Sequence, residues 1–227
     1  MFDNFSKRSK AVRAALDLAK EKSWGDISLA DIAGAANVGL ADLRREFTCK
    51  TDILRAFQAE IDAEVLTKAR PAAEAQSPRD RLFDIVMTRF EVMQPYKPAL
   101  KRIAAHLCCR PGEAATLICG SLASHYWMLA GAGAKLDGPG GALRVAGLTA
   151  IYGRVFQVWL EDDTPSLDKT MAALDKRLGK GKRMLSGIET ACGDVCRIAC
   201  GLLPRGWTRG GRSEAQPDTG PAPAASA

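Results

Sequence analysis

The sequence predicts an all-α protein in which an N-terminal helix-turn-helix domain of three helices precedes a larger helical domain. Apolar residues recur every three or four positions along most of the chain, which is the period of an α-helix. No convincing alternation of apolar and polar residues, the mark of a half-buried strand, is found. Two short helical patterns lie between longer ones and are separated by Asn37-Val38-Gly39, residues that tolerate turns. This arrangement is typical of a helix-turn-helix.

The first predicted helix covers residues 6–22. Val12 and Leu16 belong to its apolar stripe, and Lys7 and Arg8 lie near its N-terminal end. The simplest interpretation of these two cations is a solvated helix end.

The second helix is predicted from Leu29 to Ala36, because Ser28 stands three residues before Asp31. A hydroxyl and a carboxylate at this spacing can satisfy the first free amides of a helix. After the turn, a third helix is expected from Leu40 to Phe47. The apolar positions of the two helices should fix the angle between them.

A fourth helix should begin near Asp52 and continue to Ala69, just before Arg70-Pro71. The residue before a proline disfavours helical geometry, so the helix should end there. The stretch that follows is rich in small residues and is the predicted domain boundary. The predicted domains are residues 1–70 and residues 79–180.

The second domain is predicted to be helical throughout. The helix predicted at Glu113–Ala130 is nearly apolar on all sides, so it should lie at the centre of the domain. Gly131–Gly141 is expected to be a loop, and Thr164 with Pro165 should start the last helix, since proline is favoured in a first turn. The predicted helices are Arg79–Met93, Ala99–Cys109, Glu113–Ala130, Ala142–Leu160 and Ser166–Leu178.

Residues 183–203 carry apolar residues at helical spacing and are predicted to form an amphipathic helix. Its apolar face would pack on its own domain, or the helix would fray. The composition of residues 204–227 predicts a disordered tail.

Length and composition exclude several classes of protein. With 227 residues, 47% of them apolar, the chain is globular rather than disordered. No run of about 18 apolar residues is present and the N-terminus has no apolar core, so neither a transmembrane helix nor a secretory signal peptide is expected. Seven cysteines without a Cys-x-x-Cys pair favour a reducing cytoplasm over a disulfide framework.

The net charge of +6 is unevenly placed. Residues 1–24 carry six cations and three acids, whereas residues 25–60 carry four cations and six acids. A DNA-reading domain is expected to hold a basic stripe, and this one is only locally basic. Phosphate contacts, however, need a few well-placed cations rather than a high total.

The cysteines and histidines predict neither an enzyme nor a metal site. Cys192, Cys196 and Cys200 share one helical face, but structural zinc sites usually use close cysteine pairs from turns, so apolar packing is predicted. His106 and His125 lie in apolar helices without the partners that a catalytic triad needs. No catalytic residue, metal or cofactor is therefore expected.

Several positions of the first domain resemble the DNA-binding signature of TetR-type transcriptional regulators. The resemblance covers roughly residues 8–57 and is carried by Ile32, Ala33, Ala36, Val38, Leu43, Phe47, Lys50, Ile53 and Leu54. The chain differs at Gly39, where the family usually has a hydroxyl residue, and at Ala41, where it has a glycine-like position. It differs also at Arg44, where an aromatic residue leans on the phosphate backbone, and the arginine would replace that contact by a charge.

The resemblance implies a homodimeric, sequence-specific DNA-binding protein. The start of the first helix would approach the DNA backbone, and Leu40–Glu46 would enter the major groove. Arg44 and Arg45 would contact phosphates or guanines, with Asp42 facing bases or supporting them. Ser28 would present its helix end to a phosphate, and Lys50 would clamp the DNA backbone. The implied DNA-binding residues are Ser28, Gly39, Leu40, Ala41, Asp42, Arg44, Arg45 and Lys50.

In the same family the second domain binds a ligand and dimerises. The last two long helices, here Ala142–Leu160 and Ser166–Leu178, would pair with those of a second copy. A small hydrophobic effector in an apolar cavity would shift the spacing of the two reading heads; alternatively, the same side chains are plain core. The candidate cavity residues are Phe90, Met93, His125, Trp127, Tyr152 and Phe156.

The second half also resembles the accessory lipid-binding proteins of ubiquinone biosynthesis, which share the regulator fold but are not known to act on DNA. The similar features are Trp127 before Ala130-Gly131, Arg144, Leu148, Tyr152, Asp162 with Pro165, Thr170 and Leu174–Arg177. This resemblance implies an alternative function, lipid binding, with the terminal amphipathic helix touching a membrane. Arg205 and Arg209 just beyond that helix would suit an anionic surface. A third alternative is a dimeric scaffold that keeps only the fold.

Overall fold

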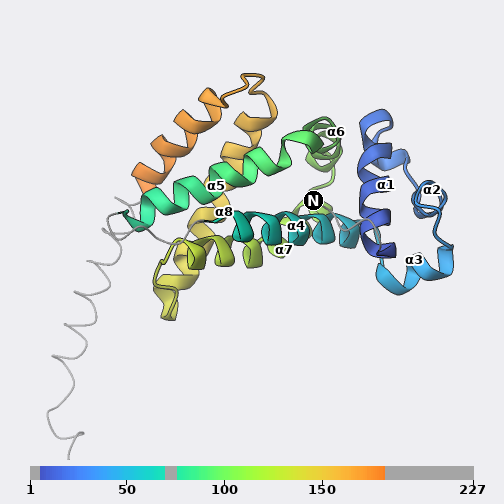
Figure 1. Cartoon of the computed structure of the whole chain (residues 1–227), viewed down its shortest axis with the longest axis horizontal. Helices are drawn as coiled ribbons and strands as arrows, with labels where there is room; N and C mark the ends of the chain where they lie inside the picture. Colours follow the sequence, from blue (N-terminus) through green and yellow to red (C-terminus); the bar gives the residue numbers. More distant parts are fainter. Residues whose placement is uncertain (1–5, 70–75, 182–227) are drawn as a thin grey trace, which may run out of the picture. The chain divides into compact units, whose positions relative to one another are not determined.

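The structure, a computed structural model, describes residues 6–69 and 76–181, and every regular element in these two ranges is helical (Figure 1). This confirms the predicted all-α class. The α-helices are α1 (Lys7–Glu21), α2 (Leu29–Ala35), α3 (Leu40–Glu46), α4 (Lys50–Lys68), α5 (Pro78–Met93), α6 (Lys97–Cys108), α7 (Pro111–Gly131) and α8 (Gly138–Leu160), followed by a helix at residues 168–181. Two short 3-10 helices, η1 (Trp24–Asp26) and η2 (Gln94–Tyr96), lie between them.

The helix-turn-helix is built on α1, which packs against α2, α3 and α4. Val12 and Leu16 of α1 are buried in the core that these helices share. Ser28 and Asp31 form the predicted capping box at the start of α2. Asn37 adopts a left-handed φ of 51° in the turn before α3, a conformation that asparagine tolerates better than most residues.

Helix α4 begins at Lys50, two residues before Asp52, near which the sequence predicted its start, and Cys49 is its N-cap. The carboxylate of Asp52 accepts hydrogen bonds from the amides of Thr48 (3.0 Å) and Cys49 (3.3 Å), which are left free at the helix start. Asp52 is therefore the third residue of the helix and not its first. From this end α4 runs into the second domain, where it packs against α5 and α7.

Helices α5, α7, α8 and the 168–181 helix contribute Phe90, Met128, Trp159 and Leu174 to a hydrophobic core that is continuous with the core of the helix-turn-helix. Helix α7 contacts α4, α5, α6 and α8, which agrees with its predicted central position, although one of its faces is exposed. Helix α6 packs against α1 and so connects this domain to the helix-turn-helix.

The glycine-rich loop is shorter than predicted. Helix α7 continues to Gly131 and α8 begins at Gly138 instead of Ala142, so the connection comprises residues 132–137 only. A proline, Pro139, occupies the first turn of α8, where its missing amide would have had no partner in any case. Gly138 enters the helix with a φ of 68°, which glycine adopts without strain.

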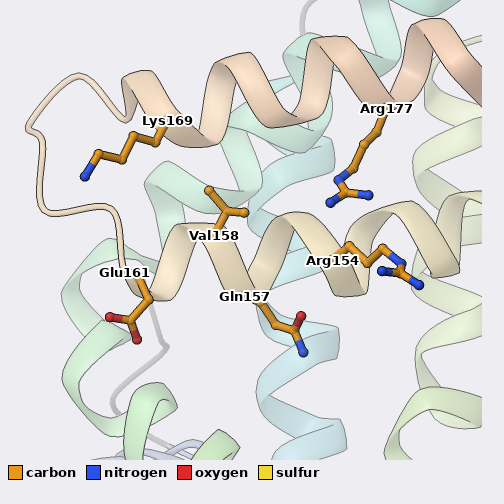
Figure 2. A pocket seen from close by; sticks show the side chains of 6 residues that line it. All are labelled: Arg154, Gln157, Val158, Glu161, Lys169 and Arg177. Carbon is orange, nitrogen blue, oxygen red and sulfur yellow. The ribbon is translucent and has the colours of Figure 1, made fainter.

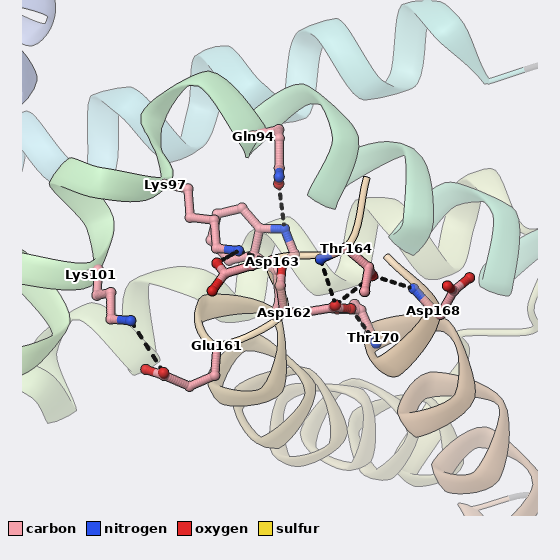
Figure 3. A network of polar contacts seen from close by, with 10 residues as sticks. Gln94, Lys97, Lys101, Glu161, Asp162, Asp163, Thr164, Asp168 and Thr170 are labelled. Carbon is pink, nitrogen blue, oxygen red and sulfur yellow. Dashed lines mark hydrogen bonds and ion pairs between the residues drawn. The ribbon is translucent and has the colours of Figure 1, made fainter. Parts of the chain in front are cut away.

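The predicted start of the last helix at Ser166 is wrong. The helix begins at residue 168, and Pro165 lies in the preceding turn, from which Leu167 emerges with a φ of 55°. Asp162 organises this turn: it is buried, and its carboxylate accepts hydrogen bonds from the amide and hydroxyl groups of both Thr164 and Thr170 (Figure 3). Burial raises the pKa of Asp162, but these hydrogen bonds outweigh it and lower the pKa to about 2.

The turn at Asp162 and the end of α8 are hydrogen-bonded to α6 and η2 (Figure 3). Lys97 donates a hydrogen bond of 2.6 Å to the carbonyl of Asp162, and the indole of Trp159 donates one of 3.0 Å to the side chain of Gln94. These contacts hold the end of α8 in place, so they fix where the 168–181 helix starts.

Some predictions lie beyond the described residues. These are the amphipathic helix at residues 183–203 and the tail at residues 204–227. The domain boundary near residues 71–78 also stays a prediction. Among the helices that the structure describes, none is long and apolar enough to cross a bilayer.

Candidate functional site

Helix α3 presents one face to solvent and the other to the core. Leu43 is buried against the helix-turn-helix core, whereas Leu40 is 56% exposed and Ala41, Arg44 and Arg45 are also exposed. These positions follow from the helical period, which puts residue 43 opposite residues 41 and 45. A short helix with a bare, partly cationic face is what insertion into a DNA groove requires.

Asp42 joins two cations at the edge of this face. One carboxylate oxygen lies 2.8 Å from Nζ of Lys7 in α1, and the other lies 2.9 Å from Nη1 of Arg45. The hydrogen bond from Lys7 and its positive charge lower the pKa of Asp42, and the charge of Arg45 adds to this. Asp42 thus supports an arginine, one of the two roles predicted for it, while cancelling part of the local positive charge.

Arg8 lies beside the end of α3. Its guanidinium is 5.0 Å from the centre of the Phe47 ring and 4.0 Å from the carboxylate of Glu46. Arg44, by contrast, makes no ion pair with any residue that the structure describes. Arg44 is therefore an exposed cation whose charge is not cancelled by a direct partner.

Lys50 points into the protein. Its ammonium donates hydrogen bonds of 2.7 Å to the carbonyls of Trp24 and Ile27, and it lies 5.1 Å from the centre of the Trp24 ring. Burial lowers the pKa of Lys50, and the nearby carboxylates of Glu113 and Asp26 offset part of this. The sequence predicted a clamp on the DNA backbone, whereas two of the three ammonium hydrogens are used on the chain's own backbone. Its contact with DNA stays a prediction.

The two short helices have different N-terminal caps. The Ser28 hydroxyl accepts from the amide of Asp31 at 3.1 Å, so α2 is capped by a side chain. Helix α3 follows Gly39, which has no side chain to cap it. The substitution of the family's hydroxyl residue by Gly39 therefore leaves the first amides of α3 without a side-chain partner.

Five of the six predicted cavity residues come together in the second domain. The Phe90 and Tyr152 rings stack with centroids 5.2 Å apart, Phe156 lies 6.2 Å from Tyr152, and His125 lies 4.9 Å from Tyr152. The hydroxyl of Tyr152 approaches the sulfur of Met93 at 3.8 Å. These side chains pack on one another, so they contribute to the core whether or not they also bind a ligand.

Trp127 does not join this cluster and is 57% exposed. Residues two apart on an α-helix point about 200° away from each other, so Trp127 must face outward if His125 faces inward. Its assignment to the cavity is therefore wrong. Trp159, which the cavity prediction omitted, is fully buried beside the cluster, with its ring centroid 5.5 Å from that of Phe156.

An ion pair inside the second domain was not predicted. Arg89 of α5 is buried and pairs with Asp62 of α4, which also accepts a hydrogen bond from Ser124 of α7. The Nε of Arg89 donates to the Tyr152 hydroxyl at 3.0 Å. The available sequence signal was the position of Arg89 on the apolar stripe of α5, three residues after Val86.

His125 is uncharged at neutral pH. It is buried, and its Nδ1 lies 3.0 Å from the hydroxyl of Thr149. Burial, together with the positive charge of Arg89, lowers the pKa of His125 to about 3. The environment thus resembles a core histidine, which was the simpler of the two predicted interpretations.

A groove of about 410 Å³ lies elsewhere, between α8 and the 168–181 helix (Figure 2). None of its lining residues belongs to the predicted cavity. The lining residues are Arg154, Gln157, Val158, Glu161, Lys169 and Arg177. Within the described part of the chain, no three side chains of the types that bind metals come together.

Comparison with solved structures identifies the fold. No protein-family model matches the chain, and no curated protein has a matching sequence. A TetR transcriptional regulator from Nitrosomonas europaea is 20% identical over 78% of this chain and 98% of its own, with a TM-score of 0.62. TetR regulators from a Rhodococcus strain (19% identity, 76% and 95% covered) and from Streptomyces coelicolor (16% identity, 88% and 90% covered) each give a TM-score of 0.53. The chain therefore has the TetR-type fold, as predicted.

Proposed function

We propose that this protein is a sequence-specific DNA-binding transcriptional regulator of the TetR type and not an enzyme. The observation that carries the proposal is the exposed face of α3, with Arg44 and Arg45 at the surface. The similarity of the fold to solved regulators supports this function. Because the lipid-binding accessory proteins share that fold, the choice between the two roles rests on the exposed face of α3. A regulator of this kind would act where the DNA is. We propose that this is the cytoplasm, the compartment that the cysteine pattern favours.

In the proposed complex α3 enters the major groove, and Arg44 and Arg45 contact phosphates or guanines. The free amides at the start of α3, beside Gly39, and the helix end at Ser28 face the backbone. Lys50 donates hydrogen bonds to the carbonyls of Trp24 in η1 and of Ile27 just after it, and thereby orients α2 relative to α4. Its remaining N–H bond would be available for a phosphate.

We further propose that the protein acts as a homodimer through α8 and the 168–181 helix. Two reading helices carried by a symmetric dimer can meet two half-sites about one turn of DNA apart. The groove between α8 and the 168–181 helix lies on the proposed interface (Figure 2).

A hydrophobic effector would act on the aromatic cluster. To enter between Phe90 and Tyr152, it would have to separate rings that now stack. Tyr152 accepts a hydrogen bond from Arg89, and Arg89 pairs with Asp62 of α4. Since α4 also packs against α1, a displacement at Asp62 would reach the helix-turn-helix.

The test is selection of bound fragments from random DNA, followed by affinity measurements on the selected site. We expect Arg44→Ala with Arg45→Ala to weaken binding at least about tenfold and to lower the salt dependence by about one unit for each lost phosphate contact. The matched control is Lys68→Ala with Lys135→Ala, which removes the same charge from exposed positions outside α3 and outside the two proposed dimer helices. Failure to select any site, with lipid co-purifying, would favour the accessory role instead.

A further inference from the structure

One face of α7 is apolar and exposed. We define the α7 face as Ile118, Leu122, Tyr126 and Trp127, whose exposed fractions are 55%, 39%, 45% and 57%. The smaller residues between them, Ala115, Cys119 and Ala123, are exposed as well. Ile118, Leu122 and Tyr126 stand four residues apart, so they are neighbours along the helix surface. The Tyr126 and Trp127 rings meet edge to face with centroids 6.0 Å apart.

This face carries no charge. Between Glu113 and Lys135 the sequence has no Asp, Glu, Lys or Arg, and the single histidine in that stretch, His125, is buried. Helix surfaces that stay in water normally carry charged residues. An uncharged exposed face on a helix whose other side is in the core indicates a surface that something covers.

We propose that the α7 face packs against the same face of a second copy of this chain. In a two-fold symmetric interface each residue meets the same surface on the partner, so a charged face would oppose like charges. The α7 face avoids this cost because it has no charged residue. Large residues alternating with Ala115, Cys119 and Ala123 also provide the ridges and grooves by which two helices interlock.

A bilayer fits this face less well. Helices that lie on membranes carry lysine or arginine along their polar flanks. The sides of α7 next to its exposed face carry Thr116, Gly120 and Ser121 instead. The guanidinium that lies against Thr116 and Gly120, that of Arg55 in α4, is already paired with Asp52 at 3.1 Å. A second copy needs no such cations.

The size of the face sets the strength of the contact. The four large side chains expose roughly 400 Å² per copy, hence about 800 Å² for a pair, which is below the roughly 1,200 Å² of stable specific interfaces and is the size of a weak, transient contact. We therefore expect weak, concentration-dependent self-association. It uses a different helix from the proposed pairing of α8 and does not depend on DNA binding, so dimers formed by α8 would join into larger assemblies.

Sedimentation velocity of the full-length chain from low to high micromolar concentration tests the proposal. The parent should form a larger species as concentration rises, and Ile118→Glu with Tyr126→Glu should abolish that step while leaving its helix content and melting temperature unchanged. Ala30→Glu with Ala35→Glu is the matched control, because it introduces the same two charges at exposed apolar positions of a different surface, on α2. This control should self-associate like the parent.

A chemical measurement covers the case in which the charged variant misfolds. Cys119 lies within the α7 face, and Cys49 is an exposed cysteine at the start of α4. In a chain that retains Cys119 alone, with the other cysteines changed to serine, a short bismaleimide should link two copies. The chain retaining Cys49 alone should stay unlinked. Equal linking of both chains, or no concentration-dependent species in the parent, would overturn the proposal. So would binding of the parent, but not of the charged variant, to phosphatidylcholine vesicles without self-association.

Discussion

The two domains use ion pairs in opposite ways. In the helix-turn-helix, Asp42 pairs with Lys7 and Arg45 at the surface, where water and salt screen the attraction. In the second domain, Arg89 and Asp62 pair inside the core, where each charge would be costly without the other. Surface pairs therefore adjust the charge of the surface around α3, whereas the buried pair couples the packing of three helices. Helix α4 takes part in both domains through Lys50 and Asp62.

Removing one member of the buried pair should give the largest effect. Arg89→Met would leave Asp62 without its partner and should lower the free energy of unfolding by about 3–5 kcal/mol. The double variant Arg89→Met with Asp62→Leu should recover much of that loss, because no charge is left unpaired. Urea denaturation of the three proteins measures this. A double variant as unstable as Arg89→Met would show that packing and not charge dominates here.

Lys50 should matter nearly as much, although it belongs to the domain in which Asp42 forms its ion pairs at the surface. Lys50→Met keeps the stem beside Trp24 but removes the donors to two carbonyls. The expected loss is about 2–3 kcal/mol, since hydrogen bonds from charged groups are the stronger kind. Thermal unfolding followed by circular dichroism would detect it. If stability is unchanged while DNA affinity falls, Lys50 acts on DNA as the sequence predicted.

The buried histidine makes the second domain sensitive to acid. The pKa of His125 is about 3 in the folded chain and near 6.5 in the unfolded one, so its contribution to stability is complete above pH 6.5. As pH falls below 6.5 the unfolded state takes up the proton first, and stability drops by about 1.4 kcal/mol per pH unit until pH approaches 3. The loss should reach about 2 kcal/mol at pH 5. His125→Asn should flatten the dependence of the unfolding free energy on pH between pH 6.5 and 3. An unaltered slope would contradict the lowered pKa of His125.

Asp42 should affect DNA binding more than stability. Asp42→Asn releases Lys7 and Arg45 and removes a negative charge beside the α3 face, so DNA affinity should rise severalfold and depend more steeply on salt. Fluorescence anisotropy with the selected site measures both. The control is Asp17→Asn, which breaks an exposed pair with Lys20 within α1. The same gain in both variants would mean that only net charge matters.

Gly39 should give the smallest effect. Gly39→Ser would supply the missing cap of α3, and a Cβ there would have its nearest contact at 3.8 Å, the carboxylate of Asp42. We expect a gain of a few tenths of a kcal/mol in unfolding free energy. Gly39→Ala, which adds the Cβ without a hydroxyl, is the control and should give no such gain in thermal unfolding.

Short-range features were predictable and long-range ones were not. The capping box of Ser28 and Asp31 needs only residues three apart, so the sequence contains all of it. The partners of Lys50 are more than 20 residues away along the chain, at Trp24 and Ile27, so its inward direction could not be predicted. The predicted start of the last helix was wrong for a similar reason, because the true start depends on the hydrogen bonds of the buried Asp162.

The sequence by itself determined the helical class, the helix-turn-helix and the outward position of Arg44 and Arg45, because helical periodicity and capping are local properties. The tertiary structure alone decided which polar side chains turn inward and which apolar ones stay outside. Arg89 is buried because Asp62 and Tyr152 meet it from other helices, and Trp127 is exposed because no described helix covers that side of α7. Periodicity shows which residues share a face, but burial of that face depends on what packs against it.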